Sequence, residues 1–193
     1  TTSYTCTVEN NVTETTVTAI ATSSVATVTG TGTKQLVVGT NTINITVTSQ
    51  SGSIKTYQIV VTRKASSDAT LKSLTVSNGT LTPEFDGSKT EYTVSVPYSV
   101  STITIAATAT SSEATVSGTG NKELVVGANK IEVTVTAQNG ETKTYTITVT
   151  REKDTDNTLK SLSLTSCTLS PTFNGNTTSY TCTVENNVTE TTV

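Results

Sequence analysis

The feature that most constrains the fold is an internal repeat with a period of 88 residues. When residues 1–105 are laid on residues 89–193, 53 of the 105 positions are identical and no gap is needed. A gapless match of this length indicates duplicated domains and not merely shared composition. A second level appears at twice the spacing, because TTSYTCTVENNVTETTV occurs as residues 1–17 and again as residues 177–193. The sequence therefore predicts a tandem array of related domains.

The composition favours strands and excludes several classes of function. Thr, Val, Ile, Ser and Asn are abundant, and β-branched residues favour strands. The chain has no His and no Trp, so the commonest general base and the best aromatic platform for sugars are missing. A net charge of −3 without a basic stripe argues against nucleic-acid binding. No apolar run approaches the roughly 18 residues that span a bilayer, so no membrane span is expected.

One repeat unit shows the alternation of a half-buried sheet. In Lys130–Ala137 and Lys143–Thr150, apolar and polar residues alternate, so that each strand has one buried and one wet face. Seven short strands in under 90 residues are typical of an Ig-like sandwich. We expect strands at Leu71–Ser77, Thr90–Val96, Thr102–Ala109, Ala114–Ser117, Glu123–Val126, Lys130–Ala137 and Lys143–Thr150. The predicted core is Tyr92, Val94, Ile103, Ile105, Val133, Val135, Tyr145, Ile147 and Val149.

This strand pattern divides the chain into three parts. Residues 1–64 are expected to form a sandwich that lacks its first strand, and residues 69–151 a complete one. Residues 158–193 supply the first strands of a third repeat and cannot close a sandwich alone. We interpret the chain as a window of a longer head-to-tail array, and favour this over donation of a first strand from one molecule to the next.

The unit opens with LKSLTVSNGTLTPEFDGSKTEYTVSVP and ends with LVVGANKIEVTVTAQNGETKTYTITVTR. Together these two motifs resemble the cadherin-like β-sandwich domain of bacterial surface proteins. The resemblance implies an all-β fold of tandem antiparallel Ig-like sandwiches in a secreted or wall-attached modular protein, and no catalytic activity. Cadherins bind calcium between domains through acidic motifs, and the full motifs are absent here. The nearest calcium candidate is the pair Asp154 and Asp156, for which an ordinary linker turn is the alternative.

The three cysteines are confined to one type of domain. Cys167 aligns with Gly79, and both Cys6 and Cys182 align with Val94. Cys167 and Cys182 flank the turn at Asn174–Gly175 symmetrically, so we expect a disulfide between them, with two buried thiols as the alternative. The position of Pro171 in that hairpin leaves the register open. Cys6 then requires a partner outside the window or in a neighbouring chain.

Binding and modification sites are less strongly indicated. Tyr98 has no aromatic counterpart in the other repeats, so it is the one aromatic residue we expect as a contact residue for a sugar or protein ligand. Asn11, Asn176 and Asn187 begin N-x-(S/T) sequons, which matter only if the source glycosylates its secreted proteins.

The sequence as a whole favours a structural role. We expect a non-enzymatic segment of an extracellular fibre, stalk or surface layer, with no resident cofactor apart from the calcium considered above. Its expected partner is the next unit, by head-to-tail self-association or by continuation of the same chain. The alternative is an adhesin module that binds a surface glycan or a host protein.

Overall fold

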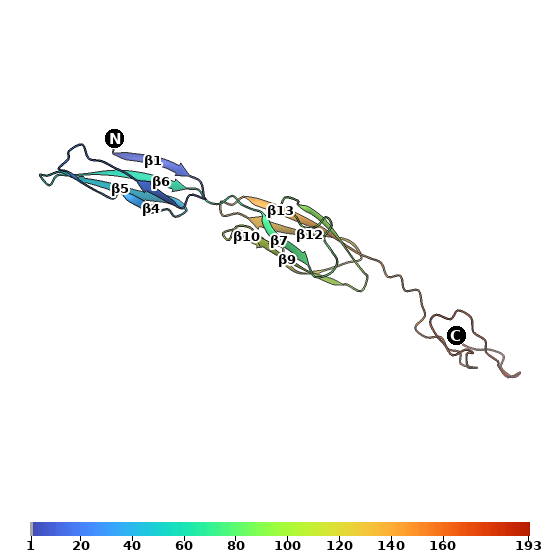
Figure 1. The fold of residues 1–193 in the computed structure, drawn as a ribbon. Coiled ribbons are helices and arrows are strands. Elements are labelled where there is room, and N and C mark those ends of the chain that lie inside the picture. Colours follow the sequence, from blue (N-terminus) through green and yellow to red (C-terminus); the bar gives the residue numbers. More distant parts are fainter. Residues whose placement is uncertain (1) are drawn as a thin grey trace. The chain divides into compact units, whose positions relative to one another are not determined.

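The computed structural model describes residues 2–193 and divides into two compact units, Thr1–Glu152 and Lys153–Val193. We describe each unit separately. The described residues form thirteen β-strands and no helix (Figure 1). No helix that could cross a membrane is therefore found within residues 2–193.

The larger unit contains a complete β-sandwich, the central sandwich, built from seven strands in two sheets. One sheet has the order β10-β12-β13-β8 and the other the order β11-β9-β7. Pairing is antiparallel except between β13 and β8, which run parallel. The strands are β7 (Leu71–Val76), β8 (Glu91–Val96), β9 (Thr102–Ala109), β10 (Thr115–Ser117), β11 (Gly120–Glu123), β12 (Gly127–Thr136) and β13 (Thr142–Arg151).

The core of the central sandwich lies between these two sheets. Alternate residues of β12 and β13 point inward, while Thr134, Thr146 and Thr148 on the opposite face remain half-exposed. The strand register therefore agrees with the alternation in the sequence. All nine residues predicted for the core are buried, which confirms the expected list: Tyr92, Val94, Ile103, Ile105, Val133, Val135, Tyr145, Ile147 and Val149.

One predicted strand is displaced. The sequence predicted a strand at Glu123–Val126, whereas the structure has β11 at Gly120–Glu123, paired with β9. The side chain of Asn129 accepts a hydrogen bond from the Val125 amide and donates to the Val125 carbonyl, at 2.9 and 2.8 Å. Val125 is thereby held in a loop, because both of its backbone groups bond to a side chain and not to a neighbouring strand.

A second, smaller sandwich precedes the central one and is called here the amino-terminal sandwich. Five of its six strands have the bounds of central strands shifted by 88 residues. Its sheets have the orders β1-β6-β5-β3 and β2-β4, and β1 runs parallel to β6. The strands are β1 (Ser3–Val8), β2 (Glu14–Val17), β3 (Thr27–Thr29), β4 (Gly32–Gln35), β5 (Gly39–Thr48) and β6 (Ile54–Arg63).

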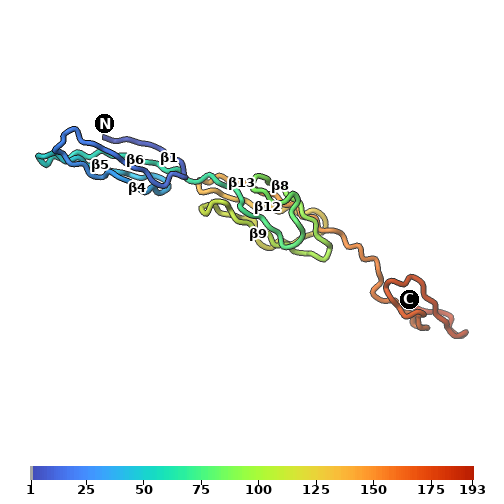
Figure 2. Tube along the Cα trace, in the orientation of Figure 1, coloured from blue at the N-terminus to red at the C-terminus, as the bar shows by residue number. Residues whose placement is uncertain are grey.

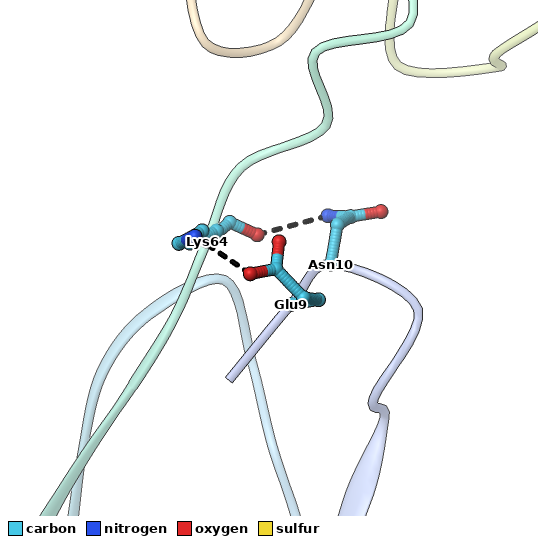
Figure 3. Close-up of polar contacts among 3 residues, drawn as sticks. All are labelled: Glu9, Asn10 and Lys64. Carbon is cyan, nitrogen blue, oxygen red and sulfur yellow. Dashed lines mark hydrogen bonds and ion pairs between the residues drawn. The ribbon is translucent and has the colours of Figure 1, made fainter. Parts of the chain in front are cut away.

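Polar contacts hold the start of the linker between the two sandwiches. The side chain of Asn10 donates to the Lys64 carbonyl at 3.0 Å, and the Lys64 ammonium lies 2.6 Å from the Glu9 carboxylate (Figure 3). Further along, the Ser66 amide donates to the Gln138 side chain, and the Asn139 amide donates to the Ser66 carbonyl. The linker is therefore hydrogen-bonded at both of its ends.

The unit Lys153–Val193 has no strand ladder within its described residues, and its trace is irregular (Figure 2, orange to red). The central sandwich explains this, because there β7 pairs with β9 and β8 pairs with β13. In this unit neither ladder forms. The isolated bridge between Ser170 and Thr181 matches the bridge between Thr82 and Thr93, and the Thr165 amide donates to the Thr192 carbonyl as the Ser77 amide donates to the Thr104 carbonyl.

Candidate functional site: the open edge of the amino-terminal sandwich

The amino-terminal sandwich has an open edge where the central sandwich has β7. In the central sandwich β9 spans eight residues, and β7 pairs with its second half. The equivalent strand β2 spans four residues and ends at Val17. Residues 18–21, which correspond to the β7-paired half of β9, are not in a strand. The edge is unpaired because no segment of the described chain lies where β7 would lie.

The open edge exposes part of the apolar core. A groove of about 600 Å³ is lined by side chains of the interior, among them Val17, Ala19, Val47, Tyr57 and Ile59. In the central sandwich the residues equivalent to Val47, Tyr57 and Ile59 are 0% exposed, whereas these three are half-buried. The groove is therefore the interior surface that a missing strand would cover.

Tyr57 illustrates what the missing segment would supply. Its counterpart Tyr145 accepts a hydrogen bond from the Leu71 amide and donates to the Gly87 carbonyl, both at 3.0 Å. Leu71 begins β7, and Gly87 lies in the turn that precedes β8. Within residues 2–193, no hydrogen-bond partner of the Tyr57 hydroxyl is present. The groove thus offers one donor and one acceptor to an incoming backbone.

The cysteines occupy two facing positions of the sandwich. Cys167 and Cys182 form a disulfide, and Cys6 is an exposed free thiol. At the equivalent positions of the central sandwich, a Cβ added to Gly79 would lie 2.5 Å from the Val94 Cγ1. The two side chains therefore point at each other, which explains why Cys167 and Cys182 can bond. Cys6 occupies the Val94 position on β1 of the amino-terminal sandwich.

Tyr98 contacts Arg151 through both its backbone carbonyl and its ring. The guanidinium of Arg151 lies 4.8 Å from the centre of the Tyr98 ring, and its Nε and Nη2 donate to the Tyr98 carbonyl. Its Nη1 donates to the Leu124 carbonyl. One arginine therefore holds two loops together, and the Tyr98 ring packs against it while remaining 43% exposed. A role of Tyr98 in ligand contact stays a prediction.

Replacing Arg151 with lysine will lower the free energy of unfolding of the central sandwich by about 1–3 kcal/mol, because lysine cannot reach both carbonyls. Urea titration of the full chain measures the change, and hydrogen exchange in the loops at Tyr98 and Leu124 locates it. Tyr98→Phe is the control, since it keeps both the ring and the carbonyl. An Arg151→Lys variant with the same free energy of unfolding as the wild type would contradict this role of the Arg151 guanidinium.

The acidic pair Asp154 and Asp156 forms a turn. The Asp156 carboxylate accepts hydrogen bonds from the Thr158 hydroxyl and amide, which lower its pKa below the ordinary value of 3.8. The hydroxyl and amide of Thr70 lower the pKa of Asp68 in the same way. The repetition of this Asp-x-Thr turn supports the linker alternative over calcium. Within residues 2–193, no cluster of three or more His, Cys, Asp or Glu suits a metal.

The sequons lie in exposed parts of the chain. The Asn11, Asn176 and Asn187 side chains are exposed, with Asn176 beside the turn at Asn174. Glycosylation at these positions stays a prediction.

Sequence reasoning did not find two kinds of residue that organise the loops. Arg63 donates to the Asn10 and Leu36 carbonyls as Arg151 does to those of Tyr98 and Leu124. Asn41 bonds the Val37 backbone as Asn129 bonds that of Val125. Arg and Asn recur at these positions in both repeats, which was the available signal. It was not decisive, because 53 positions recur and most of them have no such role.

The comparison with protein families concerns the central sandwich. Residues 71–152 match the family described as "Cadherin-like beta sandwich domain". The resemblance inferred from the sequence is confirmed for this part of the chain, which is a cadherin-like β-sandwich domain. This fold is typically extracellular and non-enzymatic. No curated protein matches the sequence.

Several solved structures of low sequence identity match the chain. The protocadherin gammaB4 extracellular domain is 15% identical, with 82% of this chain and 32% of that one covered, at a TM-score of 0.33. The human desmocollin-1 ectodomain is 13% identical, with 88% and 41% covered, at 0.26. The fibronectin(III)-like modules of Clostridium thermocellum CbhA are 12% identical, with 76% and 88% covered, at 0.24. The chain spans about a third of the length of that protocadherin gammaB4 extracellular domain.

Proposed function

We propose that this chain is a structural segment of an extracellular fibre, stalk or surface layer, in which each sandwich is a spacer of fixed length. The observation that carries the proposal is the recurrence of five strands at a spacing of 88 residues, each set with its own apolar core. In arrays of this kind, stability comes from the core of each unit and from contacts between neighbours.

The linker supports the same function. Its hydrogen bonds to Asn10 at one end and to Gln138 at the other restrict the backbone from Lys64 to Ser66. A spacer needs such restriction, because a freely jointed linker fixes neither the distance nor the orientation between the domains that it joins.

The spacer function predicts a narrow distance distribution between the two sandwiches. One spin label on an exposed position of each sandwich in the full chain, measured by double electron–electron resonance, should give a single narrow peak. Replacing residues 64–68 with a Gly/Ser segment of equal length should broaden it, because that segment makes none of these bonds. A wild-type distribution as broad as that of the Gly/Ser variant would overturn the proposal. Specific binding in a glycan screen, abolished by Tyr98→Ala, would favour the adhesin alternative.

A further inference from the structure

We infer that the central sandwich bears tension along the chain, that this tension loads its strands in shear between Leu71 and Arg151, and that the Tyr145 hydroxyl delays the detachment of β7. The inference rests on the proposed function, since a spacer in a fibre or stalk is pulled at both of its ends. It concerns the central sandwich alone, in which both sheets are complete.

The chain enters and leaves the central sandwich at opposite ends (Figure 1). The entry end lies beside the turn between β12 and β13, because the Asn139 amide donates to the Ser66 carbonyl just before β7. β7 starts at this end, where the Leu71 amide bonds to Tyr145. From the same turn β13 runs ten residues, about 33 Å, to Arg151 at the exit end. Tension between the two ends therefore acts along β7 and β13.

Tension in this direction loads the strand ladders in shear. The hydrogen bonds of an antiparallel pair are perpendicular to the strands, so a force along one strand strains all the bonds of its ladder together. A force across the strand would instead break the bonds one after another. Because β7 and β13 belong to different sheets, the load must also pass between the sheets through the side chains that join them.

β7 is the strand that we expect to detach first. It is six residues long, pairs only with β9 and has a register shift between Leu71 and Ser73. β13 is ten residues long and lies between β12 and β8. At its exit end, the Arg151 guanidinium also bonds to the Tyr98 and Leu124 carbonyls. The exit strand is therefore held more firmly than the entry strand.

Tyr145 joins the entry strand directly to the exit strand. From β13, its hydroxyl accepts a hydrogen bond from the Leu71 amide and donates to the Gly87 carbonyl, both at 3.0 Å. The Tyr145 side chain is 0% exposed, so water does not compete for these bonds. The first residue of β7 cannot slide past β13 without breaking one of them. The Tyr145 hydroxyl thus acts at the point where tension enters the sandwich.

Tyr92 provides a matched control in the same core. It is 2% exposed, and its hydroxyl bonds to the Asp86 and Lys89 carbonyls at 2.7 and 3.1 Å. Both carbonyls belong to the turn just before β8, the strand that carries Tyr92. These bonds do not join β7 to β13, so they stay intact when β7 detaches.

The test applies a constant force to the full chain, through handles at its two ends, and records the dwell time before the central sandwich unfolds. A step of about 25 nm identifies this event, because residues 71–151 extend to about 28 nm and span about 3 nm when folded. The amino-terminal sandwich gives a shorter step of about 18 nm.

The two tyrosine variants should differ in dwell time. Tyr145→Phe should shorten it about tenfold, because one hydrogen bond is lost from the barrier to detachment of β7. Tyr92→Phe should leave it within about twofold, because bonds that persist in the transition state do not change the unfolding rate. Hydrogen exchange without force measures the stability lost in each variant, so that a difference in dwell time reports the position of the bond.

The direction of pulling gives a second measurement that does not depend on the tyrosine variants. Handles on azide-bearing side chains at Ser67 and Glu141, both exposed, attach at the entry end alone. The force then acts across β7 and breaks its bonds one at a time. At the same force the dwell time should be at least about tenfold shorter than with handles at the chain ends, because several bonds no longer break together.

Two outcomes would overturn the inference. The first is an equal change of dwell time in Tyr145→Phe and Tyr92→Phe. The second is a dwell time with handles at Ser67 and Glu141 that equals the one with handles at the chain ends. Neither result would alter the distance distribution that tests the spacer function, so the two failures are distinguishable.

Discussion

Replacing Tyr145 with alanine will lower the free energy of unfolding of the central sandwich by about 4 kcal/mol. The Tyr145 side chain is 0% exposed between the two sheets. Its removal leaves a cavity of aromatic size and also leaves the Leu71 amide without its hydrogen-bond acceptor. The Gly87 carbonyl keeps a donor, because the Lys143 ammonium also bonds to it.

Hydrogen exchange on the full chain measures this loss, because the slowest amides of β12 and β13 report unfolding of the central sandwich alone. Tyr145→Phe separates the two contributions, since it keeps the ring and removes only the hydroxyl. We expect about 1–2 kcal/mol for that change.

The repeat provides a matched control at Tyr57. This residue has the same position in the amino-terminal sandwich, but it is half-buried beside the open groove and its hydroxyl has no partner within residues 2–193. Tyr57→Ala should therefore cost the amino-terminal sandwich about 1–2 kcal/mol. Equal losses at Tyr57 and Tyr145 would contradict the view that the first sandwich is open at this edge.

Much of the central sandwich could be predicted from the sequence because local alternation determines which face of a strand is buried. In residues 131–136 of β12 and 145–150 of β13 each apolar residue alternates with a polar one, so only one register buries the apolar set. The nine predicted core residues follow directly from this pattern.

Strand β11 was misplaced because its position depends on a side chain and not on alternation. Leu124, Val125 and Val126 have strand-like composition, yet Val125 is 69% exposed. The side-chain amide of Asn129 forms hydrogen bonds with the backbone of Val125. The strand that pairs with β9 is therefore Gly120–Glu123. Composition alone cannot reveal a hydrogen bond between a loop and a side chain four residues later.

The groove could be predicted only in part. The repeat alignment indicated that residues 1–64 lack a first strand, but the pairing of that strand is non-local. Only the structure relates β7 to β9 and β8 to β13, and thereby shows that the two segments flanking the turn at Asn174–Gly175 have no ladder between them. The disulfide was predicted from an ideal hairpin around this turn. In the structure the two segments do not pair with each other as such a hairpin.

The second large loss of stability is expected on substitution of Gly118, because of its backbone conformation. This residue has a φ of +86°, and a Cβ added to it would lie 2.0 Å from the Glu132 carbonyl oxygen. Glu132 lies within β12, which is paired with β13, so its carbonyl cannot move away without breaking the ladder. Gly118→Ala therefore adds a steric clash to the cost of a left-handed backbone, and we expect a loss of at least about 3 kcal/mol.

Gly120 is the control for this substitution, because it lies two residues away with a φ of +89° and nothing within 4 Å of an added Cβ. Gly120→Ala should cost only the backbone term, about 1–2 kcal/mol. Hydrogen exchange of β12 in the full chain compares the two variants. If both lose the same stability, the close approach to Glu132 is not what requires glycine. If Gly118→Ala loses more, Gly30 should behave alike in the amino-terminal sandwich, since its added Cβ would lie 2.1 Å from the Asn44 carbonyl oxygen.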